Sequence, residues 1–161
     1  MGTETRHRLR WLPSDLDEDE LDVHVLREVL LAQHDRLRSL LDALEAGAVS
    51  VIGSPSRPPL DLRGPLETAA EALADHMRGE ERALAMLLPR GATTASELAK
   101  LCDDHARQRE DLESMRRLAA SSDDAISLAL AVRAFVADVR LDMDLEDRRY
   151  LSSRWPMSER T

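Results

Sequence analysis

Apolar residues recur every three or four positions along four long stretches of this chain, which is the period of a helix that buries one face. Aromatic residues make up only 2% of the 161 residues, so a core has to be built from Leu, Ala, Val and Met. These residues suit closely packed helices better than β-sheets, which favour aromatic and β-branched side chains. The sequence therefore predicts an all-α fold.

The first two predicted helices are separated by a long link. The first is expected over about residues 18–47 and to end at Gly47. The segment 51–64 is rich in Pro, Gly and Ser and is expected to be a loop. Pro65 then opens the second helix at a first-turn position, and this helix is expected to stop at residues 89–91.

The last two predicted helices begin with residues that cap helices. Thr94 and Glu97 have the spacing of a capping box, and the Ser and Asp residues at 121–124 supply the next N-cap. Four helices joined by mostly short links predict an up-down-up-down four-helix bundle. We expect the bundle to span residues 18–153, between an N-terminal segment over 1–17 and a C-terminal tail over 154–161.

Charge and cysteine content limit the partners and the compartment. The formal net charge is −9, and arginines are interleaved with acidic residues, which argues against nucleic acid and membrane surfaces as partners. Cys102 is the only cysteine, so an internal disulfide is excluded. The first twenty residues lack the apolar run of a signal peptide, and no stretch approaches transmembrane length. We therefore expect a cytoplasmic protein.

Each predicted helix carries at least one metal-ligating side chain where its apolar pattern places a core residue. These side chains are His34, His76, Glu80, His105, Asp142 and Glu146. Burying an unpaired charge costs several kcal/mol, whereas a whole domain has only about 5–15 kcal/mol of net stability. The side chains must therefore pair with one another, reach water at an end of the bundle, or bind a cation.

The spacing of these residues favours the cation. Residues four apart on a helix lie about 40° apart and about 6 Å along the axis, so His76 and Glu80 can converge on one ion. The order repeats in the second half of the chain, where a single His again precedes a pair four apart. Two helical hairpins related by a pseudo-twofold axis would bring both sets to one cavity. Imidazole and carboxylate in a bundle suit iron first, with manganese or zinc possible.

This order of ligand-type residues resembles the hemerythrin-like, or HHE cation-binding, domain family. The stretch LADHMRGEERALAMLLP over residues 73–89 resembles the most recognisable helix of that family, and the resemblance covers about residues 20–151. It implies a four-helix bundle with a non-heme di-iron centre that meets dioxygen, peroxide or nitric oxide, or senses oxygen or iron. It also implies that His34, His76, Glu80, His105 and Glu146 are iron ligands, with a carboxylate bridging the irons.

Two positions depart from the family pattern. Asp142 stands where the family normally has His, and Arg109 stands where some members have a further His. Asp142 can still ligate, and it would make the site harder and better at stabilising ferric iron. Alternatively, Arg109 and Asp142 form a salt bridge in the space of one iron, which leaves a mononuclear or empty site. Reversible oxygen carriage is the family role that these departures favour least.

Two functions follow from these patterns. The first is a non-heme iron protein that binds, senses or reduces dioxygen, peroxide or nitric oxide, and any enzymatic activity would be that of a peroxide- or dioxygen-reactive oxidoreductase. In it, Asp75, Asp104 or Asp147 is expected to orient the histidines from outside. The second is a helical scaffold without metal that acts through protein contacts, favoured by Asp142, Arg109 and the charged outer faces.

Overall fold

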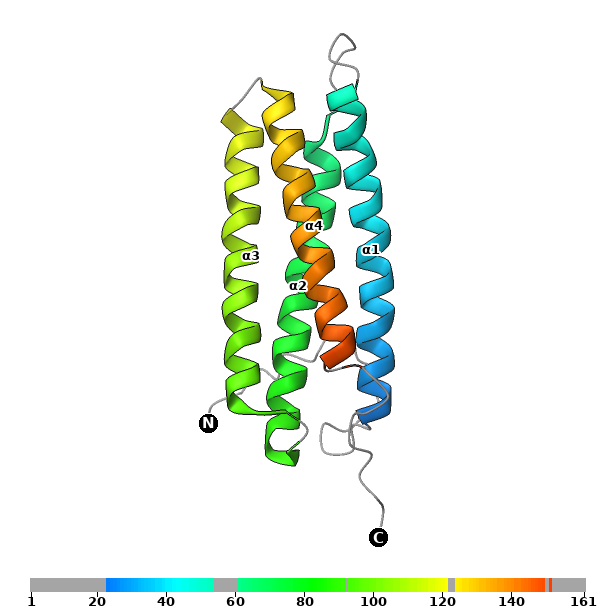
Figure 1. Cartoon of the computed structure of the whole chain (residues 1–161), viewed down its shortest axis with the longest axis vertical. Helices are drawn as coiled ribbons and strands as arrows, with labels where there is room; N and C mark the ends of the chain where they lie inside the picture. Colours follow the sequence, from blue (N-terminus) through cyan, green and yellow to red (C-terminus); the bar gives the residue numbers. More distant parts are fainter. Residues whose placement is uncertain (1–22, 54–60, 92, 122–123, 150, 152–161) are drawn as a thin grey trace, which may run out of the picture.

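The computed structural model contains four α-helices and one short 3-10 helix in the residues that it describes (Figure 1). It describes residues 23–53, 61–91, 93–121, 124–149 and 151. The helices are α1 (Val23–Gly53), α2 (Arg63–Leu87), α3 (Ala95–Ser121) and α4 (Ala125–Arg149), and the 3-10 helix η1 (Leu88–Arg90) follows α2. No strand occurs in these ranges, so the predicted all-α class is confirmed. The segments predicted over 1–17 and 154–161 lie outside the described residues.

Successive helices run in opposite directions, as the predicted up-down-up-down bundle requires (Figure 1). Helix α1 packs against α2 and α4, and α3 packs against the same two helices. Because the links are short and the helices are similar in length, consecutive helices pack as antiparallel neighbours. None of the described helices is both long and apolar enough to cross a membrane.

Helix α1 ends later than the sequence predicted, and residues 18–22 of the predicted helix lie outside the described residues. It continues through Gly47 to Gly53, and α2 begins at Arg63, so the predicted loop over 51–64 includes residues of both helices. Gly47 does not end α1 but lies in its interior, where Leu62 packs closely: a Cβ on Gly47 would lie 2.9 Å from Leu62 Cδ2. The glycine therefore serves a close approach between α1 and the start of α2.

The predicted N-caps of α3 and α4 are confirmed. Thr94 Oγ1 accepts a hydrogen bond from the backbone N–H of Glu97 at 3.2 Å, and Glu97 Oε2 accepts one from the backbone N–H of Thr94 at 2.9 Å. This exchange is the capping box. At α4, Asp124 Oδ1 accepts the backbone N–H groups of Ile126 and Ser127 at 3.2 and 3.1 Å. Both helices thus begin where their cap residues satisfy otherwise unpaired donors.

The core consists of two apolar clusters separated by a polar layer. The larger cluster includes Leu37, Leu41 and Leu44 of α1, Leu66, Leu73 and Met77 of α2, Leu112 and Met115 of α3, and Val132, Phe135, Val139 and Met143 of α4. The smaller cluster consists of Leu26, Leu30, Ala83, Leu84, Leu87, Leu101 and Leu151. Between them lie the buried side chains of His34, His76, Glu80, His105 and Glu146, which we call the polar layer.

Replacing Gly47 with Leu should lower the free energy of unfolding by about 1–3 kcal/mol, because the new side chain must displace the buried Leu62. Gly64→Leu is the matched control, since nothing lies within 4 Å of a Cβ at that position. Urea denaturation of the two variants measures the difference. Equal losses of stability would show that the contact with Leu62 does not explain Gly47.

Candidate metal centre

Five of the six predicted site residues meet in the polar layer, and all four helices contribute to it. His34 comes from α1, His76 and Glu80 from α2, His105 from α3 and Glu146 from α4. One ligand-type atom of each of His34, His76, Glu80 and Glu146 lies within 4.8 Å of the other three. His105 adjoins this group, because its Nε2 lies 3.5 Å from Glu80 Oε2 and 3.7 Å from Glu146 Oε1.

The three imidazoles direct their Nε2 atoms toward the interior of the layer. His34 Nε2 lies 3.1 Å from His76 Nε2 and 3.6 Å from Glu146 Oε2. His76 Nε2 lies 3.3 Å from Glu80 Oε2. Nitrogen and carboxylate oxygen atoms that face one another at these distances surround a common point, which is the arrangement that a metal ion needs.

The Nδ1 atoms of the same three rings face outward and donate hydrogen bonds. His34 Nδ1 donates to Asp147 Oδ1 at 2.7 Å, His105 Nδ1 to Glu81 Oε1 at 2.9 Å, and His76 Nδ1 to Gln33 Oε1 at 3.0 Å. An oxygen acceptor at Nδ1 keeps the proton on that atom and leaves the lone pair of the neutral ring on Nε2. Metal-binding histidines show this pattern, in which the second ring nitrogen is held from outside.

Two arginines hold the outer carboxylates in place. Arg38, four residues after His34, donates from Nη2 to Asp147 Oδ2 at 2.5 Å. Arg109, four residues after His105, donates from Nη2 to Glu81 Oε1 at 2.6 Å. Arginine, carboxylate and histidine therefore form one chain between α1 and α4 and another between α3 and α2, and the two chains correspond residue for residue along the sequence repeat.

The predicted alternative of a salt bridge between Arg109 and Asp142 is wrong, because Arg109 pairs with Glu81. Asp142 Oδ2 instead accepts a hydrogen bond from Gln108 Nε2 at 2.9 Å and lies 3.8 Å from Arg107 Nη2. Asp142 is thus held at the edge of the layer and is not brought into the converging group. Its role as a metal ligand stays a prediction.

Of the three carboxylates predicted to orient the histidines, Asp147 contacts one and the other two face elsewhere. Asp75 pairs with Arg78 on the surface, and Asp104 pairs with Lys100. Sequence reasoning missed the supporting roles of Glu81 and Gln33. The match between Glu81 and Asp147 in the sequence repeat was the available signal for Glu81, because equivalent positions of a pseudo-twofold pair have equivalent neighbours.

The buried carboxylates of the polar layer need positive charge that hydrogen bonds within the layer do not supply. Glu80 is completely buried, and neither of its oxygens accepts a hydrogen bond from any described residue. Burial raises the pKa of Glu80, but its interactions with the rings of His105 and His76 outweigh burial and lower the pKa to about 2. Burial lowers the pKa of His105, but Glu146 and Glu80 raise it to about 10. Without metal, this imidazole therefore keeps a proton that balances Glu80.

Glu146 differs from Glu80, since burial raises its pKa above the ordinary value and the nearby charge of Glu80 adds to the effect. A second negative charge in the layer thus requires more positive charge than one protonated imidazole supplies. A cation bound by the Nε2 atoms and the carboxylates would supply it and would give the oxygens of Glu80 a partner. The residues present therefore fit a metal ion.

A comparison with known protein families agrees with this geometry. The family model of the hemerythrin HHE cation binding domain matches residues 25–152. The chain belongs to this family. The matched range contains every residue of the polar layer and nearly all of the bundle, so family and structure together indicate a helical metal-binding protein. No curated protein and no solved structure matches the chain.

The outer carboxylates should support metal binding from outside the metal's own ligand set. We expect Asp147→Asn and Glu81→Gln each to weaken metal affinity about 10–100-fold, because the histidine held by that carboxylate loses its fixed orientation and some basicity. Asp75→Asn is the matched control, since Asp75 contacts Arg78 on the surface. Competition with a chelator measures the affinities, and an unchanged affinity in Asp147→Asn and Glu81→Gln would contradict the assignment.

The free energy of unfolding of the metal-free protein should be highest between about pH 4.5 and pH 6.5 and should be lower at more acidic and at more alkaline pH. Folded His105 keeps its proton up to about pH 10 whereas the unfolded residue loses it near 6.5, so its stabilising contribution is lost as the pH rises between these values. The lowered pKa of Glu80 has the opposite effect on the pH dependence. The stability that ionised Glu80 contributes is lost as the pH falls from about 4.5 to about 2.

Urea denaturation in the presence of chelator checks this dependence. We expect the unfolding free energy to decline from pH 7 to pH 10 in the metal-free protein and to decline less in His105→Gln. The same alkaline decline in both proteins would show that His105 does not hold the proton.

Proposed function

We propose that this hemerythrin-family domain is a non-heme iron protein that binds, senses or reduces dioxygen, peroxide or nitric oxide. The observation that carries the proposal is the orientation of the three imidazoles. Each donates its Nδ1 proton to an outer acceptor and presents Nε2 to the buried carboxylates. A bundle that needed only to pack would gain nothing from this arrangement, because burying these groups costs free energy.

The nature of the ligands favours iron. The layer offers imidazole nitrogen and carboxylate oxygen and no thiolate among its described residues, and such mixed sets suit iron, with manganese or zinc as alternatives. We infer two irons. The first would be held by His34, His76, Glu80 and Glu146, and the second by His105 and Asp142, with Glu80 and Glu146 shared between the two. The short distances from His105 to both glutamates support the sharing.

Iron would supply a change of oxidation state and an open coordination position for the ligand. The protein's own residues set the conditions. The apolar clusters on either side of the layer exclude water from most of its surroundings. The outer carboxylates and Gln33 hold the rings in place, so that little rearrangement is needed when the ligand binds.

Metal analysis of the freshly purified protein, combined with its absorption spectrum, tests the proposal. Two irons per chain with an oxo-to-iron band in the near ultraviolet are expected for a di-iron centre. One iron per chain would restrict the site to the four residues that converge most closely. A metal-free protein whose melting temperature ignores added iron and chelator would contradict the proposal and favour a scaffold, since a ligand of the native state must stabilise it.

His76→Ala should abolish iron binding, because it removes an imidazole that lies between His34 and Glu80. Asp75→Ala is the matched control on the same turn of α2, where the side chain is exposed and pairs with Arg78. Iron per chain is measured for both variants, and circular dichroism verifies that both remain helical. Full iron content in His76→Ala would refute the assignment of His76.

A further inference from the structure

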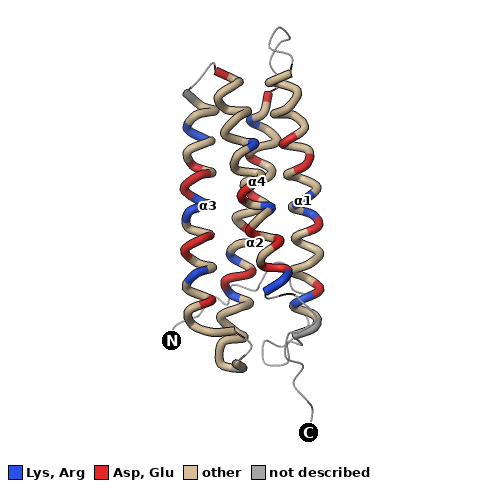
Figure 2. Tube along the Cα trace, viewed as in Figure 1, with Lys and Arg blue, Asp and Glu red and all other residues tan. Residues whose placement is uncertain are grey.

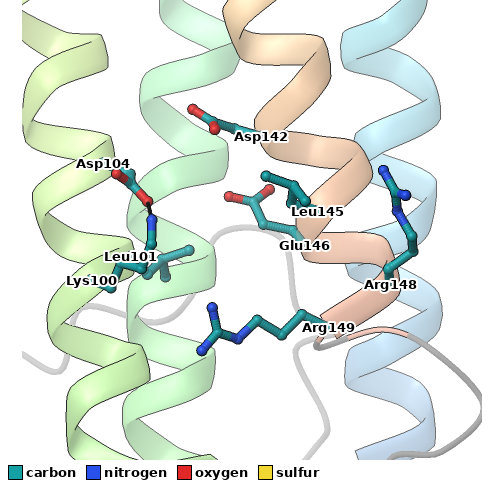
Figure 3. A pocket seen from close by; sticks show the side chains of 8 residues that line it. All are labelled: Lys100, Leu101, Asp104, Asp142, Leu145, Glu146, Arg148 and Arg149. Atoms are coloured by element: carbon teal, nitrogen blue, oxygen red, sulfur yellow. Dashed lines mark hydrogen bonds and ion pairs between the residues drawn. The ribbon is translucent and has the colours of Figure 1, made fainter.

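A pocket of about 330 Å³ opens between α3 and α4 directly beside the polar layer (Figure 3). Glu146 belongs both to this pocket and to the group of ligand-type atoms that converge in the layer. Asp142 lies one helical turn away on the same helix, and Leu101 and Leu145 line the walls. The pocket therefore connects solvent to the edge of the candidate metal centre.

The pocket lies where the second half of the sequence repeat differs from the first. In the first half of the bundle, His76 precedes Glu80 by four residues, and its ring fills the layer with only 3% of its surface exposed. In the second half, Asp142 precedes Glu146 by four residues, but its shorter side chain is held by Gln108 and is 19% exposed. The space that a ring would occupy next to Glu146 is thus left on the α3–α4 side.

The charges that line the pocket are of both signs. At the inner end, the carboxylates of Asp142 and Glu146 lie one turn apart on α4 (Figure 3). Three cations also line it: Lys100 pairs with Asp104, Arg149 pairs with Glu97, and Arg148 donates to the backbone carbonyl of Asp144. Asp142 and Glu146 are among the predicted metal ligands, so a molecule that enters the pocket arrives at the candidate centre.

We propose that exogenous ligands of the size of dioxygen, nitric oxide and hydrogen peroxide reach the metal centre through this pocket. The space is ample for such molecules, because one water molecule takes up about 30 Å³ in the liquid. This inference rests on the proposed function for its ligands. The route is formed by residues of α3 and α4, so its existence can be tested in protein that contains no iron.

The first experiment uses dissolved dioxygen as a paramagnetic probe of the diamagnetic protein, either metal-free or zinc-loaded, and records the relaxation of leucine methyl groups by NMR. Leu101 and Leu112 are matched, since both lie on α3 and are 3% and 4% exposed, but only Leu101 lines the pocket. We expect dioxygen to relax the Leu101 methyls several-fold more than those of Leu112. Equal relaxation of the two would overturn the route.

The second experiment measures the rate at which nitric oxide binds to the ferrous protein. Leu145→Trp narrows the mouth and should slow binding several-fold, whereas Leu145→Ala widens it and should accelerate binding. Leu141→Trp is the matched control, because Leu141 is exposed one turn away on α4 and does not line the pocket. Rates that are the same in all variants would refute the route for ligands. A protein without iron but with selective relaxation of Leu101 would refute the proposed function and leave the pocket as assigned.

Discussion

Glu80 lies completely buried between the rings of His76 and His105, with no hydrogen bond from a described residue to either oxygen. Removing a carboxylate from water costs several kcal/mol even after relaxation, which is a large share of the stability of a domain of this size. The cost is tolerable only if positive charge lies next to the carboxylate. In the metal-free protein, His105 supplies it by retaining a proton. A bound cation would supply more and would leave all three rings neutral.

This requirement explains why neighbouring residues on α2 and α4 have different tasks. Glu80 and Glu81 are adjacent, as are Glu146 and Asp147, and adjacent residues on a helix point about 100° apart. The first of each pair faces the layer, and the second reaches the histidine of the neighbouring helix. Helix α2 thus supports the ring on α3, and α4 supports the ring on α1. The orientation of the ligand-type rings therefore depends on the packing of the helices.

The outer surface adds a further contribution to this packing. Charged residues of both signs are distributed along all four helices (Figure 2). Arg140 joins α4 to Asp42 and Glu45 of α1, and Arg116 joins α3 to Glu67 of α2. Exposed ion pairs of this kind contribute little to stability individually. They also tie α4 to α1 and α3 to α2 on the outside of the bundle.

The helical period predicted every residue of the polar layer from the sequence, although it also placed Asp142 there. His34, His76, Glu80, His105 and Glu146 each lie on the apolar face of their helix, and a buried face has a single direction. The same period could not predict which partner an arginine at the edge of the layer would choose. Arg109 can reach either neighbouring helix, and the choice of Glu81 over Asp142 depends on side-chain length and on competition from Gln108.

The error at Gly47 has a similar origin. Glycine ends helices often enough that its place before a segment rich in Pro and Gly predicted a boundary. In the structure, the contact of Leu62 with this position explains the glycine, and α1 continues to Gly53. Such a contact joins residues that are fifteen positions apart in the chain, and local patterns carry no information about it. The buried Ala48 and Val51, which continue the apolar face of α1, were the local signal for the longer helix.

Asp142, which stands where the first half of the repeat has His76, changes the edge of the polar layer. A histidine at position 142 would have to find an outer acceptor for one ring nitrogen, as His76 does in Gln33. Asp142 instead accepts a hydrogen bond from Gln108 of α3. The ends of the polar layer are therefore chemically unequal. At His76 the layer is occupied by a ring held between two helices, whereas at Asp142 the edge carries two carboxylates and adjoins the pocket between α3 and α4.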